Sequence, residues 1–152
     1  MITYQTEAYH EVIEDLKEIL PQHYEEVALY RDKIDLNPDY DFYEDGYYEA
    51  NSIHFFTARD NGKLVGYVVT MIYPNPHYKD HIYAVNDLLY VLPEYRHTEV
   101  AVQMLKQFEQ EMKDLGVSVM TMHMKTYKTF EALMDSLEFD KSEYLFTKYI
   151  GS

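Results

Sequence analysis

A long amphipathic segment flanked by two apolar segments constrains the fold of this chain more than any other feature. Between residues 98 and 115 an apolar side chain recurs every three or four positions, which predicts a helix with one buried face. Thr98 is suited to cap the start of this helix and Gly116 to end it. Residues 82–92 and 117–124 are expected to be strands, and the helix between them is long enough for a right-handed crossover. The segment therefore predicts two parallel strands in one sheet.

The other predicted elements make the rest of that sheet antiparallel. Residues 52–59 and 64–73 are rich in strand-forming side chains, and Asn61-Gly62 between them is typical of a tight hairpin turn. Further strands are expected at residues 1–6 and 143–150, and helices at residues 8–20, 22–33 and 129–137, with Pro21 closing or kinking the first helix. We expect one domain over residues 1–152 of the α/β class, with a central mixed, mostly antiparallel sheet and helices on both faces.

Composition and charge exclude several classes of function. The 152 residues include no cysteine, so disulfides, thiolate catalysis and cysteine zinc sites are excluded. No apolar run reaches the roughly 18 residues of a membrane span, and the first residues do not resemble a secretory signal, so we expect a cytoplasmic protein. The net charge of -14 disfavours nucleic acid as a partner; it favours a cationic one, or serves solubility alone. His77 and His81 have no evident third ligand, so no metal site is expected.

The segment from Asp87 to Ala101 contains the residue types that can hold an anionic ligand. It reads as the end of a strand, a short loop that contains Pro93, and the start of the long helix. A helix start offers unpaired N–H groups and a partial positive charge, which together can hold a pyrophosphate. Arg96 in the loop can add a full positive charge. These features predict a phosphate-binding site at the helix start.

The same segment resembles the acetyl-CoA motif of the GNAT superfamily of N-acetyltransferases. Val91, Pro93, Tyr95, Arg96 and Ala101 match that motif, and the order of predicted elements along the whole chain is similar to that of the family. The match implies acetyl-CoA as co-substrate and transfer of an acetyl group to a primary amine. It implies the following cofactor-binding residues: Leu89, Tyr90, Val91, Arg96, His97, Thr98, Glu99, Val100 and Ala101. Residues 23–26 and 74–79 also look like those of GNAT proteins carried by phages and prophages.

Three positions depart from the family pattern. Glu99 stands where the family has a glycine in the pyrophosphate loop, and Glu138 stands where a second glycine precedes Phe139. Met134 aligns with the tyrosine that many members use as general acid, and a thioether cannot donate a proton. We therefore keep a second interpretation, in which the chain is a catalytically impaired GNAT-fold binding protein or an acidic inhibitor of a basic host factor.

The proposed chemistry needs a base for the amine and an acid for the leaving thiolate. Asp87 is the candidate base, because it should share the side of its strand with Val85, Leu89 and Val91, where burial would raise its pKa. It can equally be a structural, hydrogen-bonded acid. Tyr144 is the candidate acid and Tyr127 an alternative, although either tyrosine can simply pack against the protein.

The acceptor amine is expected to meet residues 35–51, which are rich in Asp, Glu and Tyr. We interpret this stretch as a long loop with about one helical turn that covers the acceptor side of the site. Its carboxylates would attract a cationic small molecule or protein amine, and its tyrosine rings could add cation–π contacts. The alternative is a solvated surface loop. A sheet edge near the C-terminus could pair two copies into a homodimer.

Overall fold

The structure, a computed structural model, describes residues 1–151 and is built on one five-stranded sheet in the order β1-β2-β3-β4-β5. The strands are β1 (Ile2–Glu7), β2 (Ile53–Asp60), β3 (Lys63–Asn75), β4 (Tyr78–Val91) and β5 (Val117–Thr121). Neighbouring strands from β1 to β4 are antiparallel, and β4 and β5 are parallel. The predicted mixed, mostly antiparallel sheet is therefore confirmed.

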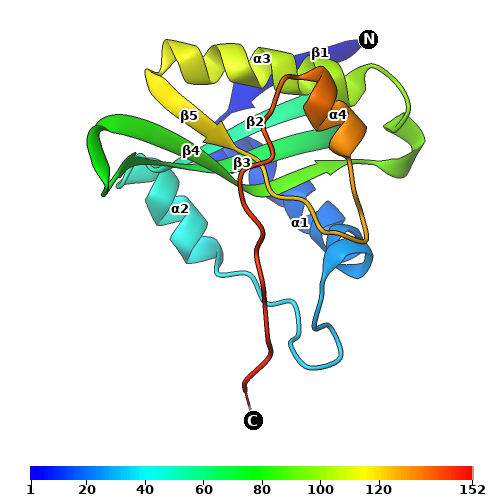
Figure 1. The fold of residues 1–152 in the computed structure, drawn as a ribbon. Coiled ribbons are helices and arrows are strands. Elements are labelled where there is room, and N and C mark those ends of the chain that lie inside the picture. Colours follow the sequence, from blue (N-terminus) through cyan, green and yellow to red (C-terminus); the bar gives the residue numbers. More distant parts are fainter. Residues whose placement is uncertain (152) are drawn as a thin grey trace.

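Helices cover both faces of the sheet, as predicted. Helices α1 (Tyr9–Val27) and α2 (Tyr40–Tyr48) lie on one face, and α3 (Val100–Asp114) and α4 (Glu131–Ser136) lie on the other (Figure 1). A single 3-10 turn, η1 (Pro93–Tyr95), follows β4. Helix α3 joins β4 to the parallel strand β5, so the predicted crossover is also confirmed.

The strand alternation of β2 shows how the sheet builds two cores. Phe55 contacts the rings of Tyr9 and Tyr47 from α1 and α2, with ring centroids 6.0 and 5.9 Å away. The next residue, Phe56, points to the opposite face and meets Phe108 of α3 at 5.8 Å. Successive strand side chains point to opposite faces, so a strand that is apolar at both positions must be covered on both sides.

Two predictions about the first half of the chain are wrong. A second helix over residues 22–33 does not form, because α1 continues through Pro21 to Val27 and is not closed by the proline. The buried stripe of α1 runs on to Leu20 and His23, and this tertiary packing outweighs the hydrogen bond that a proline removes. The expected long loop over residues 35–51 contains the nine-residue helix α2, whose start is capped by Asp39 accepting a hydrogen bond from the N–H of Phe42 at 3.1 Å.

The turns between strands and the C-terminal residues agree with the sequence-based predictions only in part. The turn at Asn61-Gly62 is confirmed, with positive φ angles of 49° and 91°. The two strands expected at residues 64–73 and 82–92 are longer than predicted, since β3 and β4 pair as far as Asn75 and Tyr78 across a two-residue turn. Strand β5 ends at Thr121 instead of residue 124. The predicted last strand over residues 143–150 is also wrong, because residues 139–151 form neither helix nor strand.

Candidate functional site

Strands β4 and β5 separate partway along β4. Their parallel pairing ends at Val85 and Thr121, and the next residue, Asn86, accepts a hydrogen bond from the N–H of His123 at 2.7 Å through its side-chain oxygen. Beyond this point the β5 side of β4, including residues 89–91, has no strand partner within residues 1–151. The buried hydroxyl oxygen of Thr121 has no hydrogen-bond partner in the described chain either. This part of the sheet therefore offers unpaired polar groups to a ligand.

A β-bulge in β4 places Asp87 on the face covered by α1 and α2. Thr70 of β3 pairs with Asn86 and Val69 pairs with Leu88, so Asp87 is the extra residue. The phenol of Tyr43, from α2, donates a hydrogen bond to Oδ2 of Asp87 at 2.6 Å. The bulge puts Asp87 and Leu88 on the same face, where strict alternation would have separated them.

Because of the bulge, only one of the three residues expected on the same face as Asp87 lies on that face. Val85 pairs with Met71 and lies on the face of Asp87, as expected. Leu89, however, pairs with Val68 and lies on the α3 face, and Val91 pairs with Gly66 beside Met104 of α3. The extra residue reverses the alternation for every position that follows it. The base candidate Asp87 and two of the residues expected to line the cofactor, Leu89 and Val91, therefore lie on opposite faces of the sheet.

Tyr43 is a residue of the site that the sequence interpretation missed. Its side chain is half-buried, and burial together with the Asp87 carboxylate raises the pKa of its phenol, so the phenol keeps its proton at neutral pH. The spacing of Tyr40, Tyr43 and Tyr47 fits one face of a helix, and this signal could have predicted α2 in place of a loop.

The loop between β4 and α3 leaves several backbone N–H groups free. The first helical N–H, that of Val100, donates to the hydroxyl of Thr98 at 3.3 Å, and the N–H of Gln103 donates to the carbonyl of Glu99 at 2.9 Å. The N–H groups of residues 97–99 and 101 make no hydrogen bond within residues 1–151. These groups, at the positive end of a 15-residue helix, are suited to hold an anion.

Arg96 ties this loop to the sheet and to α1. Its Nε donates to the carbonyl of Val91 at 2.9 Å and its Nη2 to Oε2 of Glu26 at 2.8 Å. Tyr90 donates to Oε1 of the same glutamate at 2.5 Å. Burial alone would raise the pKa of Glu26, but the hydrogen bonds from Tyr90 and Arg96 outweigh burial and hold that pKa below its usual range. The carboxylate is therefore charged and clamps β4 and the loop to the end of α1.

A buried histidine packs against Tyr90, the tyrosine that donates a hydrogen bond to Glu26. His23 of α1 stacks on the ring of Tyr90 with centroids 4.4 Å apart, and its Nδ1 lies 2.9 Å from the phenol oxygen of Tyr67. Burial lowers the pKa of His23 to about 4, so its ring is neutral at neutral pH. Burial and the hydrogen bond to Glu26 raise the pKa of Tyr90 to about 12.

The two glutamates that replace family glycines occupy different backbone conformations. Glu99 is exposed, and its φ of -77° is one that any residue adopts. Burial, and to a smaller extent the charge of Glu99, raise the pKa of Tyr4 in β1. Glu138 has a φ of 64°, in the left-handed region that favours glycine, directly after α4.

The candidate proton donors are not gathered beside Asp87. Tyr144 is 79% exposed and makes no hydrogen bond within the described chain, so the fold does not fix its phenol at the site. Tyr127 donates its phenolic hydrogen bond to the carbonyl of Val27 at 2.7 Å. Met134 is the buried residue of α4 and belongs to the core. Among the sequence candidates, only Asp87 is held by a hydrogen bond at the bulge.

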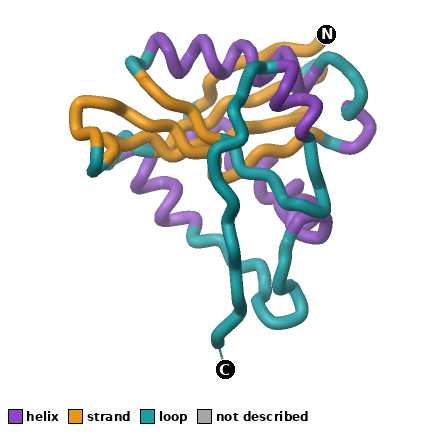
Figure 2. Tube along the Cα trace, in the orientation of Figure 1, coloured by secondary structure: helices purple, strands orange, loops and turns teal. Residues whose placement is uncertain are grey.

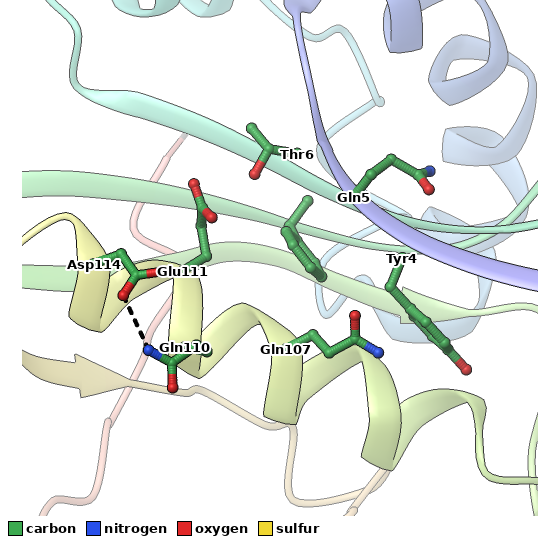
Figure 3. A pocket seen from close by; sticks show the side chains of 8 residues that line it. Tyr4, Gln5, Thr6, Gln107, Gln110, Glu111 and Asp114 are labelled. Carbon is green, nitrogen blue, oxygen red and sulfur yellow. Dashed lines mark hydrogen bonds between the residues drawn. The ribbon is translucent and has the colours of Figure 1, made fainter.

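A shallow hollow elsewhere on the protein does not belong to this site. It has a volume of about 270 Å³ and lies between β1 and α3 (Figure 3). It is lined by polar and acidic side chains and one phenylalanine, namely Tyr4, Gln5, Thr6, Phe56, Gln107, Gln110, Glu111 and Asp114. None of these residues comes from β4 or from the loop that follows it. Within residues 1–151 there is also no cluster of three metal-ligating side chains. No helix in that range is long and apolar enough to cross a membrane.

Comparison with known proteins identifies the fold. The family model described as "Acetyltransferase (GNAT) family" matches residues 10–134. An aminoglycoside acetyltransferase from an uncultured soil metagenomic sample, solved with sisomicin, is 13% identical with a TM-score of 0.77, over 99% of this chain and 96% of that chain. Ribosomal-protein-alanine N-acetyltransferase from Brucella melitensis biovar Abortus 2308 is 17% identical with a TM-score of 0.76, over 100% and 99% of the two chains.

A third structure was solved with the co-substrate. It is a predicted acetyltransferase with acetyl-CoA from Clostridium acetobutylicum, 17% identical with a TM-score of 0.68 over 97% of this chain and 96% of that chain. A search of curated proteins found no match. At these identities the likeness to solved structures shows the fold alone.

Proposed function

The chain belongs to the acetyltransferase (GNAT) family, and we propose that it transfers the acetyl group of acetyl-CoA to a primary amine of a small cationic acceptor. The observation that supports this most directly is the bulge in β4 beside the point where β4 and β5 part. There the carboxylate of Asp87 and the unpaired edge of residues 89–91 lie within a few positions of each other along one strand. Such a place can receive a thioester from one face and an amine from the other.

The structure fits acetyl-CoA in two ways. The free N–H groups of residues 97–99 and 101 would hold its pyrophosphate, and the unpaired edge of residues 89–91 would hydrogen-bond its amide-containing arm. The buried hydroxyl of Thr121, which has no hydrogen-bond partner in the described chain, could bind a polar group of the same ligand. Glu99 is exposed, so its carboxylate can point to solvent and away from the phosphates. Arg96 acts through its hydrogen bonds to Val91 and Glu26, which fix the loop.

Asp87 would act as the base that accepts a proton from the attacking ammonium, directly or through water. The protonated phenol of Tyr43 donates a hydrogen bond to this carboxylate and holds it in place. The amine nitrogen would then form a bond to the acetyl carbon while the carbon–sulfur bond breaks. Backbone N–H groups near residues 89–91 would stabilise the negative charge on the acetyl oxygen. Tyr144 stays a proposal for the proton donor to the thiolate.

Helix α2 supports a cationic acceptor. Its exposed side chains include the carboxylates of Asp41, Glu44 and Asp45, on the same helix as the Asp87 partner Tyr43. Carboxylates at this position would raise the local concentration of a cation. Phe42 and Tyr48 of the same helix are each 51% exposed and could stack on such a ligand. This chemistry supports a small cationic acceptor, such as an aminoglycoside-like polyamine.

The function is tested in two measurements. Isothermal titration of the full chain with acetyl-CoA should give one binding site per chain, and desulfo-CoA serves as the non-reacting probe. Release of free CoA thiol should then be followed with a panel of cationic and neutral amines. Saturable thiol release with a cationic amine supports acetyl transfer. Failure to bind acetyl-CoA at millimolar concentration would refute it.

A second candidate, a GNAT-fold protein that binds acetyl-CoA without transfer, is favoured by Met134. Met134 is buried, and it aligns with the tyrosine that many members of the family use as general acid. Among the described residues, the phenol that donates a hydrogen bond to Asp87 is that of Tyr43. The same titration separates the candidates. Binding without turnover on any amine would favour this role, whereas an acidic inhibitor of a basic partner would bind neither acetyl-CoA nor its analogue.

A further inference from the structure

The outer edge of β1 is open to a further strand. β1 is the first strand in the sheet order, and within residues 1–151 it pairs with β2 alone (Figures 1 and 2). The N–H of Asn61 donates a hydrogen bond to the carbonyl of Met1 at 3.2 Å, and the register that follows contains no shift along β1. Backbone groups alternate in direction along an antiparallel strand, so the N–H and C=O groups of Ile2, Tyr4 and Thr6 point away from β2. No other segment of the described chain hydrogen-bonds to these groups, and an extended chain of another molecule can do so.

Helix α3 lies beside this edge and forms the second wall of a groove (Figure 3). The side chains of Tyr4 and Thr6 point toward this helix, because Thr6 pairs with Phe56 and Phe56 contacts α3. The hollow of about 270 Å³ lies between the two walls. Four side chains of α3, spaced by three or four positions and therefore on one face of the helix, line it: Gln107, Gln110, Glu111 and Asp114. The strand with free backbone groups thus also contributes side chains to the hollow.

The hollow is acidic, and its carboxylates lack a cation. Glu111 makes no hydrogen bond or ion pair within residues 1–151, and Asp114 accepts a hydrogen bond from the side-chain amide of Gln110 at 3.0 Å. None of the lining residues is a lysine or an arginine. Burial lowers the pKa of His54, the histidine nearest in charge to Glu111, so its neutral ring does not offset the carboxylate at neutral pH. A positively charged side chain would complement this surface.

A second copy of this chain does not supply that charge at β1. The strand itself, Ile2-Thr3-Tyr4-Gln5-Thr6-Glu7, contains no lysine or arginine. Pairing of two β1 edges would bring the Glu111 and Asp114 carboxylates of both copies together, and each copy carries a net charge of -14. The occupant that fits the groove is therefore a basic segment of a different protein.

We propose that the groove between β1 and α3 binds an extended basic segment of another protein, which adds a sixth strand outside β1. Its backbone would hydrogen-bond to the outward groups of Ile2, Tyr4 and Thr6. A lysine or arginine side chain of the segment would enter the hollow and meet Glu111 and Asp114. The groove contains no residue of β4 or of the loop that follows it, so this inference does not rest on acetyl transfer.

The probe is a short peptide, blocked at both ends, in which arginine alternates with valine. It has no primary amine, so it cannot serve as an acetyl acceptor. Titration calorimetry with the full chain measures affinity, and amide hydrogen exchange followed by NMR locates the contact. We expect exchange to slow at Tyr4 and Thr6, whose N–H groups point outward, and to stay unchanged at Gln5, whose N–H already faces β2.

Two methylated peptides test strand addition from the side of the ligand. One carries N-methyl groups on its arginines and the other on its valines, so each loses the donors of one edge. Only one of the two should lose binding, because a strand presents a single edge to β1. Binding that survives in both would show attraction by charge alone and overturn the proposal.

Variants of the chain test the same groove from the side of the protein. Thr6→Pro removes one outward N–H, a place where edge strands tolerate proline, and should abolish protection at Tyr4 while the circular dichroism spectrum is unchanged. Glu111→Gln with Asp114→Asn should weaken binding by roughly 3- to 30-fold at low salt. The matched control, Glu14→Gln with Glu18→Gln on the exposed side of α1, removes the same charge and should bind normally.

Three results would overturn the proposal. The first is a peptide that does not bind at millimolar concentration, or that binds without slowing exchange at Tyr4 and Thr6. The second is an equal loss of affinity in the α3 variant and in its α1 control. The third is protection of Tyr4 and Thr6 in the free chain that grows with protein concentration, because a second copy would then occupy the edge.

Discussion

Asp87 shows how one residue can decide which face of a sheet carries a reactive group. As the extra residue of the β4 bulge it lies on the α1–α2 face with Leu88, and its carboxylate meets Tyr43. Without the bulge, Leu88 and Asp87 would point to opposite faces. β-bulges often lie beside active sites because they turn a side chain without ending the strand. The geometry therefore fits the role of base that we propose for Asp87.

Replacing Asp87 with Asn should reduce kcat by roughly 10²- to 10⁴-fold, the usual range for loss of a general base. The isosteric amide keeps the hydrogen bond from Tyr43 but cannot accept the ammonium proton. The measurement is steady-state thiol release with a cationic amine, together with titration of acetyl-CoA, whose affinity should stay within a factor of about two. Asp114→Asn, on the exposed end of α3, is the matched control. An Asp87→Asn enzyme with unchanged kcat would remove this residue from the mechanism.

His23 should make the fold sensitive to acid. Its pKa is about 4 in the folded protein, because burial disfavours the charged ring, and near its ordinary value of 6.5 in the unfolded chain. Between these values the unfolded chain binds more protons, so stability falls as the pH falls through this window. The loss should reach up to about 3 kcal/mol. At pH values well above the pKa of His23 in the unfolded chain, this loss of stability is absent.

Chemical denaturation at a series of pH values between about 7 and about 4.5 tests this. The original chain should lose free energy of unfolding across the window. His23→Gln, which keeps a polar side chain toward Tyr67 but does not titrate, should be less stable at neutral pH and show a flatter dependence. His77→Gln, on the exposed β3–β4 turn, should follow the original chain. Equal slopes for His23→Gln and the original chain would contradict the assignment.

At the scale of elements, Glu26 connects the C-terminal end of α1 to the loop that precedes α3. It receives hydrogen bonds from Tyr90 and Arg96, and Arg96 in turn holds the carbonyl of Val91. The loop whose free N–H groups are proposed to hold pyrophosphate is therefore positioned from across the sheet. Pre-organised donors bind more tightly than donors that must be ordered on binding.

Glu26→Gln should weaken acetyl-CoA binding by roughly 10-fold, because it leaves the half-buried Arg96 without its charge partner and loosens the loop. The amine KM should change little, since Glu26 lies away from the exposed acids of α2. Isothermal titration gives the first quantity and steady-state kinetics the second. Glu25→Gln, an adjacent exposed residue with the same change of charge, is the control and should bind normally. Equal effects of the two variants would show that general charge, not the clamp, matters.

Helix α2 should decide which amines are accepted. Neutralising Asp41, Glu44 and Asp45 together should lower kcat/KM for cationic amines by roughly 10-fold or more at low salt and leave neutral amines unchanged. Asp39 is retained because it caps the helix. The matched control neutralises Glu109, Glu111 and Asp114 of α3, on the opposite face of the sheet. If the α2 variant keeps its preference for cations, this helix does not select charge.

At the scale of the whole molecule, charge opposes association. Each copy carries a net charge of -14, so two copies repel one another at low ionic strength. A dimer held by backbone hydrogen bonds and apolar side chains would not be weakened by salt. Dimer formation should therefore depend on salt in the direction opposite to that of an ion-pair interface.

Raising the ionic strength from about 0.05 M to about 0.5 M should strengthen the dimer several-fold, because the Debye length falls well below the distance between most surface charges. Sedimentation at several protein concentrations measures the dissociation constant. Sodium chloride and sodium acetate at equal ionic strength separate screening from effects of a particular anion. A dimer that dissociates as salt is added would show that ion pairs hold the two copies.

The sequence by itself determined the local elements and the class of the fold. Periodicity was sufficient for α3, for the crossover to β5 and for the Asn61-Gly62 hairpin, because each depends on side chains close together in the chain. The motif around Val91 to Ala101 was sufficient for the family, which the match over residues 10–134 confirms. The assignments of Asp87, Tyr144 and the cofactor-binding residues stay predictions.

Only the tertiary structure decided the features that depend on distant contacts. Helix α1 continues past Pro21 because His23 is buried against β3 and β4, and residues 40–48 become a helix because Tyr43 and Tyr47 pack against the sheet. The side of β4 on which Asp87 lies depends on a bulge that strand β3 imposes. Residues 143–150 have the composition of a strand but pair with no strand of residues 1–151, and a strand needs a partner for its backbone hydrogen bonds. Composition sets what a segment can form, and the neighbouring elements decide what it does form.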